Sequence, residues 1–204
     1  MRKRPLSPKN KKKLFIGIGI LLLTLLFLFL NLNTIIDRKP ILTIETPPKI
    51  SKSNTEIFTL DVTISSLGKA IYPAASMSIS FDSSRLEFLG IEEGNVFIRN
   101  EEGDASQKLP DWSCNPKQCN QSGKINIMYL DTTGGKNAFS QELLTADENV
   151  VLRLKFRLRG SIRANDICDF IFEDAIFAAS EESESLAMTK NTLTVRNGKI
   201  VVGE

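Results

Sequence analysis

Histidine is absent from this chain of 204 residues, and tryptophan occurs only once. Without histidine the commonest general base is missing, and no serine or cysteine stands beside a base that would activate it. The paired acids Glu92-Glu93, Glu101-Glu102 and Glu181-Glu182 lie in polar runs that are typical of solvated surface. The sequence therefore predicts a non-catalytic protein with no cofactor and no metal site.

Acidic residues are missing from the first 36 positions, where basic residues are concentrated. Seven of the 26 bases lie within residues 1–13, and subtracting them leaves 19 bases against 24 acids, a net charge of −5 for the remainder. Such a domain repels phosphate, which argues against nucleic acid as a partner.

Polar side chains are also scarce between residues 14 and 36. As a helix this run would span roughly 25 to 35 Å, the thickness of a bilayer core. Its basic flank predicts a cytoplasmic tail at 1–13, a transmembrane signal-anchor helix at 14–36, a linker at 37–40 and an extracellular domain at 41–204, held by a single pass in the cell membrane. A cleaved secretory signal is the alternative, although no small-x-small cleavage site follows the run.

Helical periodicity is almost absent after residue 40, where apolar and polar side chains alternate. The alternating stretches are 41–46, 55–66, 76–81, 86–91, 124–131, 149–160, 169–178 and 192–203. A period of two predicts antiparallel strands with one dry face and one wet face. We expect an Asn197-Gly198 hairpin turn and a long polar loop over 99–123. The pattern predicts an all-β fold, a jelly-roll β-sandwich of about nine strands.

Cysteine is limited to three positions. Cys114 and Cys119 bracket four residues in "CNPKQC", and an oxidising exterior would allow a disulfide between them. Cys168 shares a strand face with Phe170 and Phe172, which predicts a small buried apolar residue. One C-x4-C pair with a distant third cysteine matches no zinc-ligand spacing.

Trp112 lies in "LPDWSCNPKQC", the polar stretch that a disulfide would stiffen. An exposed indole there could stack on a sugar ring or fill a pocket on a partner. Alternatively, the loop folds down over the sandwich and Trp112 is its plug. The first interpretation predicts extracellular polysaccharide as a ligand.

Four cations face outward from one predicted strand. They are Arg153, Lys155, Arg157 and Arg159. Such a ladder could meet an acidic partner or an anionic wall polymer. The alternative is a solvated strand that resists edge pairing and is compensated by Glu87, Glu92 and Glu93 on a neighbour.

Four segments in order resemble the cohesin domain family. They are "SISFDSSRLEFLGIEEGNVF", "GKINIMYLDTTGG", "NVVLRLKFRLRG" and "FEDAIFA…LTVRNGKIVV". In the first, Phe81-Asp82 and Leu86-Glu87 occupy the positions of the family's aromatic-Asp pair and its "LE". The resemblance implies a nine-stranded jelly roll with a flat sheet face that accepts a helix of a dockerin, a small calcium-loaded module on a partner protein linked to polysaccharide degradation.

The resemblance also implies where the partner would bind. The outward residues of the third predicted strand, Ala74, Ser76, Ser78 and Ser80, would lie on that face, and all four are small. We therefore predict a cell-surface binding module of cohesin type with a protein partner. The alternatives are a carbohydrate-binding sandwich at the cell envelope and a structural envelope protein without a discrete ligand.

Overall fold

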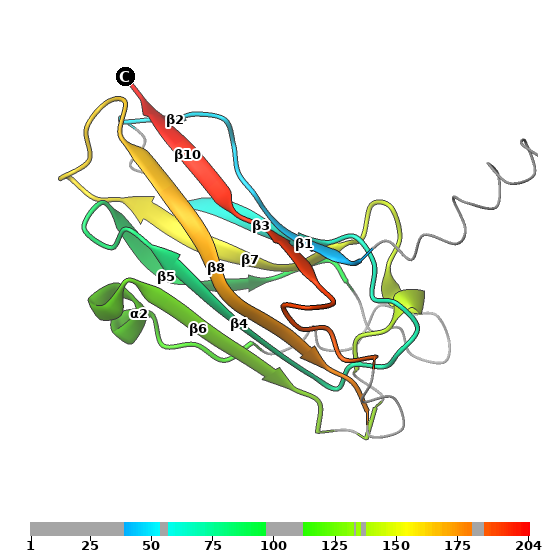
Figure 1. The fold of residues 1–204 in the computed structure, drawn as a ribbon. Coiled ribbons are helices and arrows are strands. Elements are labelled where there is room, and N and C mark those ends of the chain that lie inside the picture. Colours follow the sequence, from blue (N-terminus) through cyan, green and yellow to red (C-terminus); the bar gives the residue numbers. More distant parts are fainter. Residues whose placement is uncertain (1–38, 54–56, 97–111, 133, 136–137, 181–185) are drawn as a thin grey trace, which may run out of the picture. The chain divides into compact units, whose positions relative to one another are not determined.

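The computed structural model describes residues 39–53, 57–96, 112–132, 134–135, 138–180 and 186–204. These residues contain ten strands and two short helices (Figure 1). Residues Lys39–Glu204 form one unit. The predicted tail at 1–13, the predicted membrane segment at 14–36 and part of the linker lie outside the described residues. None of the helices in the described ranges is long and apolar enough to cross a membrane.

The elements follow the predicted alternation closely. In order they are β1 (Ile41–Glu45), β2 (Ile50–Ser51), β3 (Phe58–Ile64), β4 (Ala74–Phe81), β5 (Leu86–Glu93), α2 (Pro116–Ser122), β6 (Lys124–Leu130), the 3-10 helix η1 (Gln141–Leu143), β7 (Val150–Leu158), β8 (Ile167–Ala178), β9 (Thr194–Arg196) and β10 (Gly198–Gly203). Every predicted alternating stretch contains a strand. The count is ten rather than nine because β2 was missed.

Two five-stranded sheets pack face to face. Sheet 1 has the order β5-β7-β3-β1-β9, and sheet 2 has the order β2-β10-β8-β4-β6. The predicted two-sheet sandwich is therefore correct. Antiparallel pairing is not universal, however, because β1 pairs with β9 and β2 pairs with β10 in parallel.

The predicted hairpin at Asn197-Gly198 is wrong. The two residues join β9 in sheet 1 to β10 in sheet 2, so the chain crosses between the sheets instead of turning back. A Cβ atom on Gly198 would lie 2.7 Å from the Cγ2 atoms of both Ile44 and Thr46, which explains a glycine at this close approach. The edge of β1 captures β9, and this long-range pairing overrides the local turn preference.

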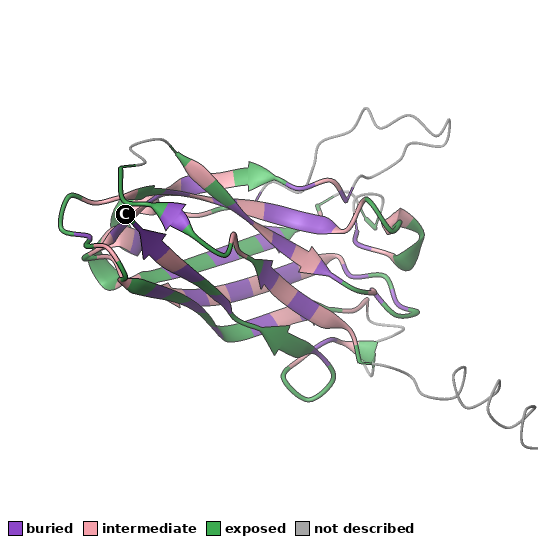
Figure 2. Cartoon of the chain, turned by 90° about the horizontal axis from the view of Figure 1, so that it is seen from above, coloured by how far each residue is buried: buried purple, intermediate pink, exposed green. Residues whose placement is uncertain are grey.

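The core lies between the sheets, as the banded burial of the strands shows (Figure 2). Phe156 of β7 is fully buried, and its ring centroid lies 5.4 Å from those of Phe81 and Phe88 and 5.1 Å from that of Phe170. These rings come from both sheets. Cys168 is fully buried on the same inner side, which confirms its prediction as a small apolar residue.

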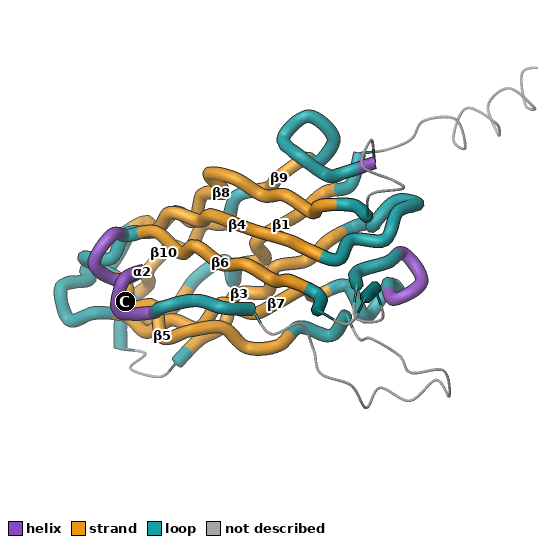
Figure 3. The backbone as a smooth tube through the Cα atoms, turned by 90° about the horizontal axis from the view of Figure 1, so that it is seen from below, coloured by secondary structure: helices purple, strands orange, loops and turns teal. Residues whose placement is uncertain are grey.

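Residues 116–122, predicted as part of a loop, form the helix α2. Asn115 caps its start by accepting a hydrogen bond from the Gln118 N–H at 3.2 Å, and Pro116 follows in the first turn. Gly123 ends it with φ at 69°. The helix contacts β5 and β6, the edge strands of the two sheets, and so covers one open side of the sandwich (Figure 3).

Candidate functional site

The outer face of sheet 2 has small side chains along its middle. The outward residues of β4 are Ala74, Ser76, Ser78 and Ser80, each only partly exposed. β4 lies between β6 and β8, whose outward residues include larger side chains. We call this row of four small residues on β4 the β4 trough.

One end of the β4 trough is apolar. In register, Ser76 lies opposite Met128 on β6 and Ile176 on β8, and Ala74 lies opposite Leu130. Met128 is 57% exposed and Leu130 is 60% exposed, so both present apolar surface to solvent. A soluble surface can carry scattered apolar side chains, but a group of them around small residues is typical of a binding site.

The other end of the trough is mostly polar, apart from Ile171 of β8, which lies opposite Ser80 and is 44% exposed. Ser78 lies between Asn126 on β6 and Asp174 on β8, and the Ser78 hydroxyl donates to the Asn126 Oδ1 atom at 2.8 Å. Beyond it, Lys124 of β6 pairs with Glu173 of β8 at 2.7 Å. Because β4 runs between β6 and β8, this ion pair must cross over the outer face of β4 at that end.

The sequence reasoning found the small residues of β4 but not their neighbours. The inward residues Ile125, Ile127 and Tyr129 of β6 alternate with Met128 and Leu130, so the period of two carried the signal for outward apolar side chains. Asp174 carried no such signal. A bulge in β8 makes Glu173 the extra residue and shifts the phase of the alternation there.

The outer face of sheet 1 is different, because the structure pairs its four predicted cations. Arg153 contacts Asp61 at 3.1 Å, Lys155 contacts Glu92 at 3.4 Å and Arg157 contacts Glu87 at 2.7 Å. Arg159 donates to the Leu86 carbonyl at 3.0 Å. These contacts support the compensated-strand interpretation. The acids Glu87 and Glu92 were expected, whereas Asp61 was not.

The two sets of predicted partner-binding residues do not come together. Ser76 and its neighbours on β4 face outward from sheet 2, whereas Arg153, Lys155 and Arg157 on β7 belong to the outer face of sheet 1. The two layers of the sandwich separate them. A single partner surface cannot contain both sets.

Trp112 is a plug and not an exposed stacking platform. It is 7% exposed, and its ring centroid lies 5.8 Å from that of Tyr129 and 5.9 Å from that of Phe139. Its indole N–H is buried, and no acceptor among the described residues lies within hydrogen-bond reach. The predicted stacking of Trp112 on a sugar or partner is therefore wrong. Both tyrosines, Tyr72 and Tyr129, are also buried. None of these three aromatic side chains is therefore exposed for stacking on a sugar ring.

The cysteines are free thiols in the structure. Cys114 is half-buried before the cap of α2, and Cys119 is buried on the helix. Burial, reinforced by the neighbouring Cys119, raises the pKa of the Cys114 thiol. The Cys114–Cys119 disulfide stays a prediction for an oxidising environment. Burial raises the pKa of Cys168 to about 11, so that thiol is unreactive at neutral pH.

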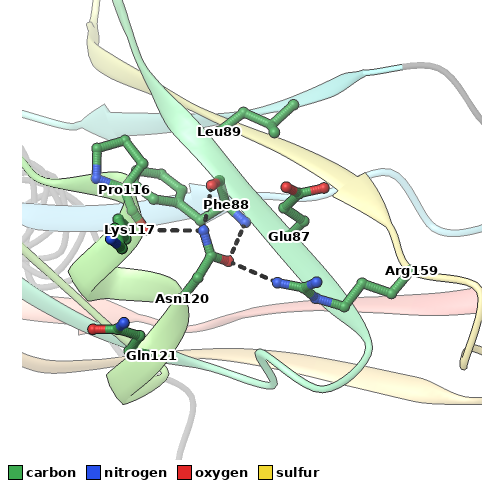
Figure 4. A pocket seen from close by; sticks show the side chains of 8 residues that line it. All are labelled: Glu87, Phe88, Leu89, Pro116, Lys117, Asn120, Gln121 and Arg159. Atoms are coloured by element: carbon green, nitrogen blue, oxygen red, sulfur yellow. Dashed lines mark hydrogen bonds between the residues drawn. The ribbon is translucent and has the colours of Figure 1, made fainter.

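A cleft of about 510 Å³ lies between α2 and the edge of sheet 1 (Figure 4). Asn120 lines this cleft and binds the edge strand. Its Oδ1 atom accepts a hydrogen bond from the Phe88 N–H at 2.9 Å, and its Nδ2 atom donates to the Phe88 carbonyl at 2.7 Å. This pair of bonds imitates a neighbouring strand. Arg159 adds a contact to Asn120 at 3.4 Å. The polar groups of the cleft thus protect the edge of β5.

Comparison with known proteins agrees on one family. The family model described as the Cohesin domain matches residues 46–196. Among curated protein sequences, none matches this chain.

Several solved structures are similar in fold. The third cohesin of ScaC from Acetivibrio cellulolyticus, in complex with the ScaB dockerin, is 15% identical with a TM-score of 0.57, covering 81% of this chain and 99% of that one. The OlpA cohesin from Clostridium thermocellum, in complex with the dockerin Doc918, has the same values. The solution structure of CaCohA2 from Clostridium acetobutylicum is 19% identical with a TM-score of 0.54, covering 81% and 92%.

Proposed function

Because this chain belongs to the cohesin domain family, we propose that it captures a dockerin-bearing protein on the outer face of sheet 2. Cohesin domains are non-catalytic binding modules, and several solved cohesins of the same fold are complexes with dockerins. The partner of this chain would place one helix along the β4 trough.

The single observation that carries this proposal is the contrast between the two outer faces: charged side chains form ion pairs on sheet 1, whereas apolar side chains stay exposed on sheet 2. Sheet 1 neutralises the charges of its outer face internally, so a partner would have to break ion pairs to bind there. Sheet 2 leaves Met128 and Leu130 more than half exposed beside small residues. Completing the burial of each side chain would contribute roughly 1 kcal/mol or more to binding. Small residues between them allow a helix backbone to approach closely.

The proposal is tested with the fragment Lys39–Glu204, which contains the whole described core. Isothermal titration calorimetry against a panel of calcium-loaded dockerin modules is expected to find at least one that binds, and binding is expected to disappear in EDTA. Ser76→Tyr fills the trough and is expected to weaken that binding by about 100-fold or more. Thr59→Tyr, an exposed position on the outer face of sheet 1, is the matched control and is expected to bind normally.

Two results would refute the proposal. One is a panel in which no dockerin binds the folded fragment, which would favour a structural envelope role. The other is equal weakening by Ser76→Tyr and Thr59→Tyr, which would show that binding does not depend on the β4 trough. Retention of the fragment on a glycan array would point instead to carbohydrate binding by a surface without tryptophan.

We further propose that residues 14–36 anchor the chain in the cell membrane with residues 41–204 outside. The support is the apolar run itself and the seven basic residues within positions 1–13. The full chain is expected to stay in the membrane fraction after alkaline carbonate extraction, and protease added to intact cells is expected to digest its C-terminal part. Release of the chain by carbonate would contradict the anchor without affecting the docking proposal.

A further inference from the structure

We propose that the helix held in the β4 trough carries one Lys or Arg that pairs with Asp174, and an apolar side chain about four residues away from that cation. This inference rests on the docking function proposed above and specifies which helix the face selects. It assigns Asp174 as the residue that determines partner charge, and Met128 with Ile176 as the residues that determine where the apolar side chain must lie.

Asp174 is an exposed carboxylate at the polar end of the trough, opposite Ser78. Its Oδ1 atom accepts the N–H of Ala175 at 3.0 Å. No cation among the described residues lies within ion-pair distance of it: Lys124 is engaged with Glu173, and Lys190, which lines a hollow together with Asp174, forms no ion pair with it. The outer face of sheet 1 shows the contrary pattern, in which Asp61, Glu87 and Glu92 are all paired. The charge of Asp174 therefore remains available for a partner.

Asn126 adds direction to this polar end. Its Oδ1 atom accepts the Ser78 hydroxyl at 2.8 Å, which leaves its amide nitrogen as the free donor. A partner helix thus meets a carboxylate on the β8 side and an amide donor on the β6 side. A cationic side chain satisfies the first group, and a side-chain or carbonyl oxygen satisfies the second.

The strand register fixes the spacing of the partner residues. From the row of Asp174 to the row of Met128 and Ile176 is two residues along the strand, roughly 6.6 Å. A helix rises ~1.5 Å per residue, so this distance corresponds to about four helical residues. Positions i and i+4 lie on the same face of a helix. A single helix can therefore present both side chains to the trough.

The ion pair between Lys124 and Glu173 marks the register of that helix. It crosses β4 next to Asp174, beyond Ser78. A helix in the trough therefore meets this ion pair at the row of Asp174, with its cation there and its apolar side chain toward Met128.

A selection experiment tests the inference. Yeast display of a calcium-loaded dockerin scaffold, with the outward positions of one docking helix randomised, is selected on the immobilised fragment Lys39–Glu204 and on its Asp174→Lys variant. The unmodified fragment is expected to enrich Lys or Arg at one position, with an apolar residue four positions away. The variant is expected to enrich Glu or Asp at that same position and to retain the apolar residue.

Binding measurements on individual clones complete the test. A clone with the enriched cation is expected to lose about tenfold or more of its affinity for Asp174→Lys. Its affinity for Asp147→Lys, the same change at an exposed position between η1 and β7, is expected to be unchanged. Binders without charge enrichment, or with equal loss for both variants, overturn this inference but leave docking intact. A library that yields no binder overturns the docking function itself.

Discussion

The two outer faces of this sandwich come from sheets of equal strand number, yet they treat their polar groups in opposite ways. On sheet 1 the cations of β7 find carboxylates on β3 and β5. On sheet 2 the side chains beside β4 leave apolar surface exposed, and Asp174 has no ion-pair partner among the residues that the structure describes. A face that satisfies its own groups offers little gain to a partner, whereas an unmatched face does.

The inner faces show no such difference. Both sheets contribute phenylalanine rings to one cluster around Phe156. The contrast between the sheets is therefore a property of their solvent-facing sides only. Substitutions in the shared core, at an edge and on each outer face test it in turn.

The largest effect is expected from the shared core. Phe156→Ala removes a fully buried ring that contacts both sheets, and it should lower the free energy of unfolding by ~3–5 kcal/mol. Urea unfolding followed by circular dichroism should remain a single transition. Ile57→Ala, at a 57% exposed position, should change stability by less than about 0.5 kcal/mol. Two separate transitions would show that the sheets unfold independently.

A smaller effect is expected at the edge of sheet 1. Asn120→Ala leaves the N–H and carbonyl of Phe88 without their side-chain partner, which should lower the free energy of unfolding by ~1–3 kcal/mol. Gln121→Ala, an exposed residue of the same cleft, is the control and should be within about 0.5 kcal/mol of the parent. Equal stability of the two variants would mean that the imitation of a strand by Asn120 contributes nothing.

The outer faces should respond differently to loss of a carboxylate. Glu87→Gln removes the partner of Arg157 and should lower stability by ~0.2–1 kcal/mol at low salt, an effect that fades as salt rises. Asp174→Asn keeps an acceptor for the Ala175 N–H and has no cation to lose, so stability should not fall. Thermal denaturation at two salt concentrations measures both. A comparable loss for Asp174→Asn would erase the contrast between the faces.

The smallest effect concerns acid. The Ser84 hydroxyl bond and, to a lesser extent, Arg85 hold the pKa of Asp82 below its ordinary value of 3.8. The folded pKa is lowered, so its stabilisation is present above the ordinary value and is lost as pH falls through the folded pKa. Asp82→Asn should therefore make stability less dependent on pH below about 4, by less than about 0.5 kcal/mol because solvent screens a side chain that is 34% exposed. An unchanged acid profile would contradict this role.

Alternation in the sequence was sufficient to predict every strand except β2, together with most inward residues, because burial on one face imposes a period of two. It could not predict the ladder on sheet 1. Asp61 meets Arg153 only because β3 pairs with β7, strands that are about ninety residues apart. The burial of Trp112 was likewise undetermined, since it depends on how its segment folds onto Tyr129 and Phe139.

Two elements were predicted wrongly for different reasons. The helix α2 could have been found locally, because Asn115-Pro116 followed by Gly123 is a start-and-stop pattern for a short helix. The crossing at Asn197-Gly198 could not, because the local sequence favours a hairpin and only the pairing of β9 with β1 prevents it. In the candidate site, Ala74, Ser76, Ser78 and Ser80 were predicted, whereas Asp174 required knowledge of the bulge in β8.

The two parallel pairs have a consequence for the order of assembly. The beginning of the sandwich, β1 and β2, is held by its end, β9 in one sheet and β10 in the other. Neither pairing can form until residues 194–203 have left the ribosome. Until then, β1 and β2 lack their parallel partners, β9 and β10. Contacts so distant along the chain slow folding. Deleting a few residues from the C-terminal end should therefore impair folding far more than the small number of deleted residues suggests.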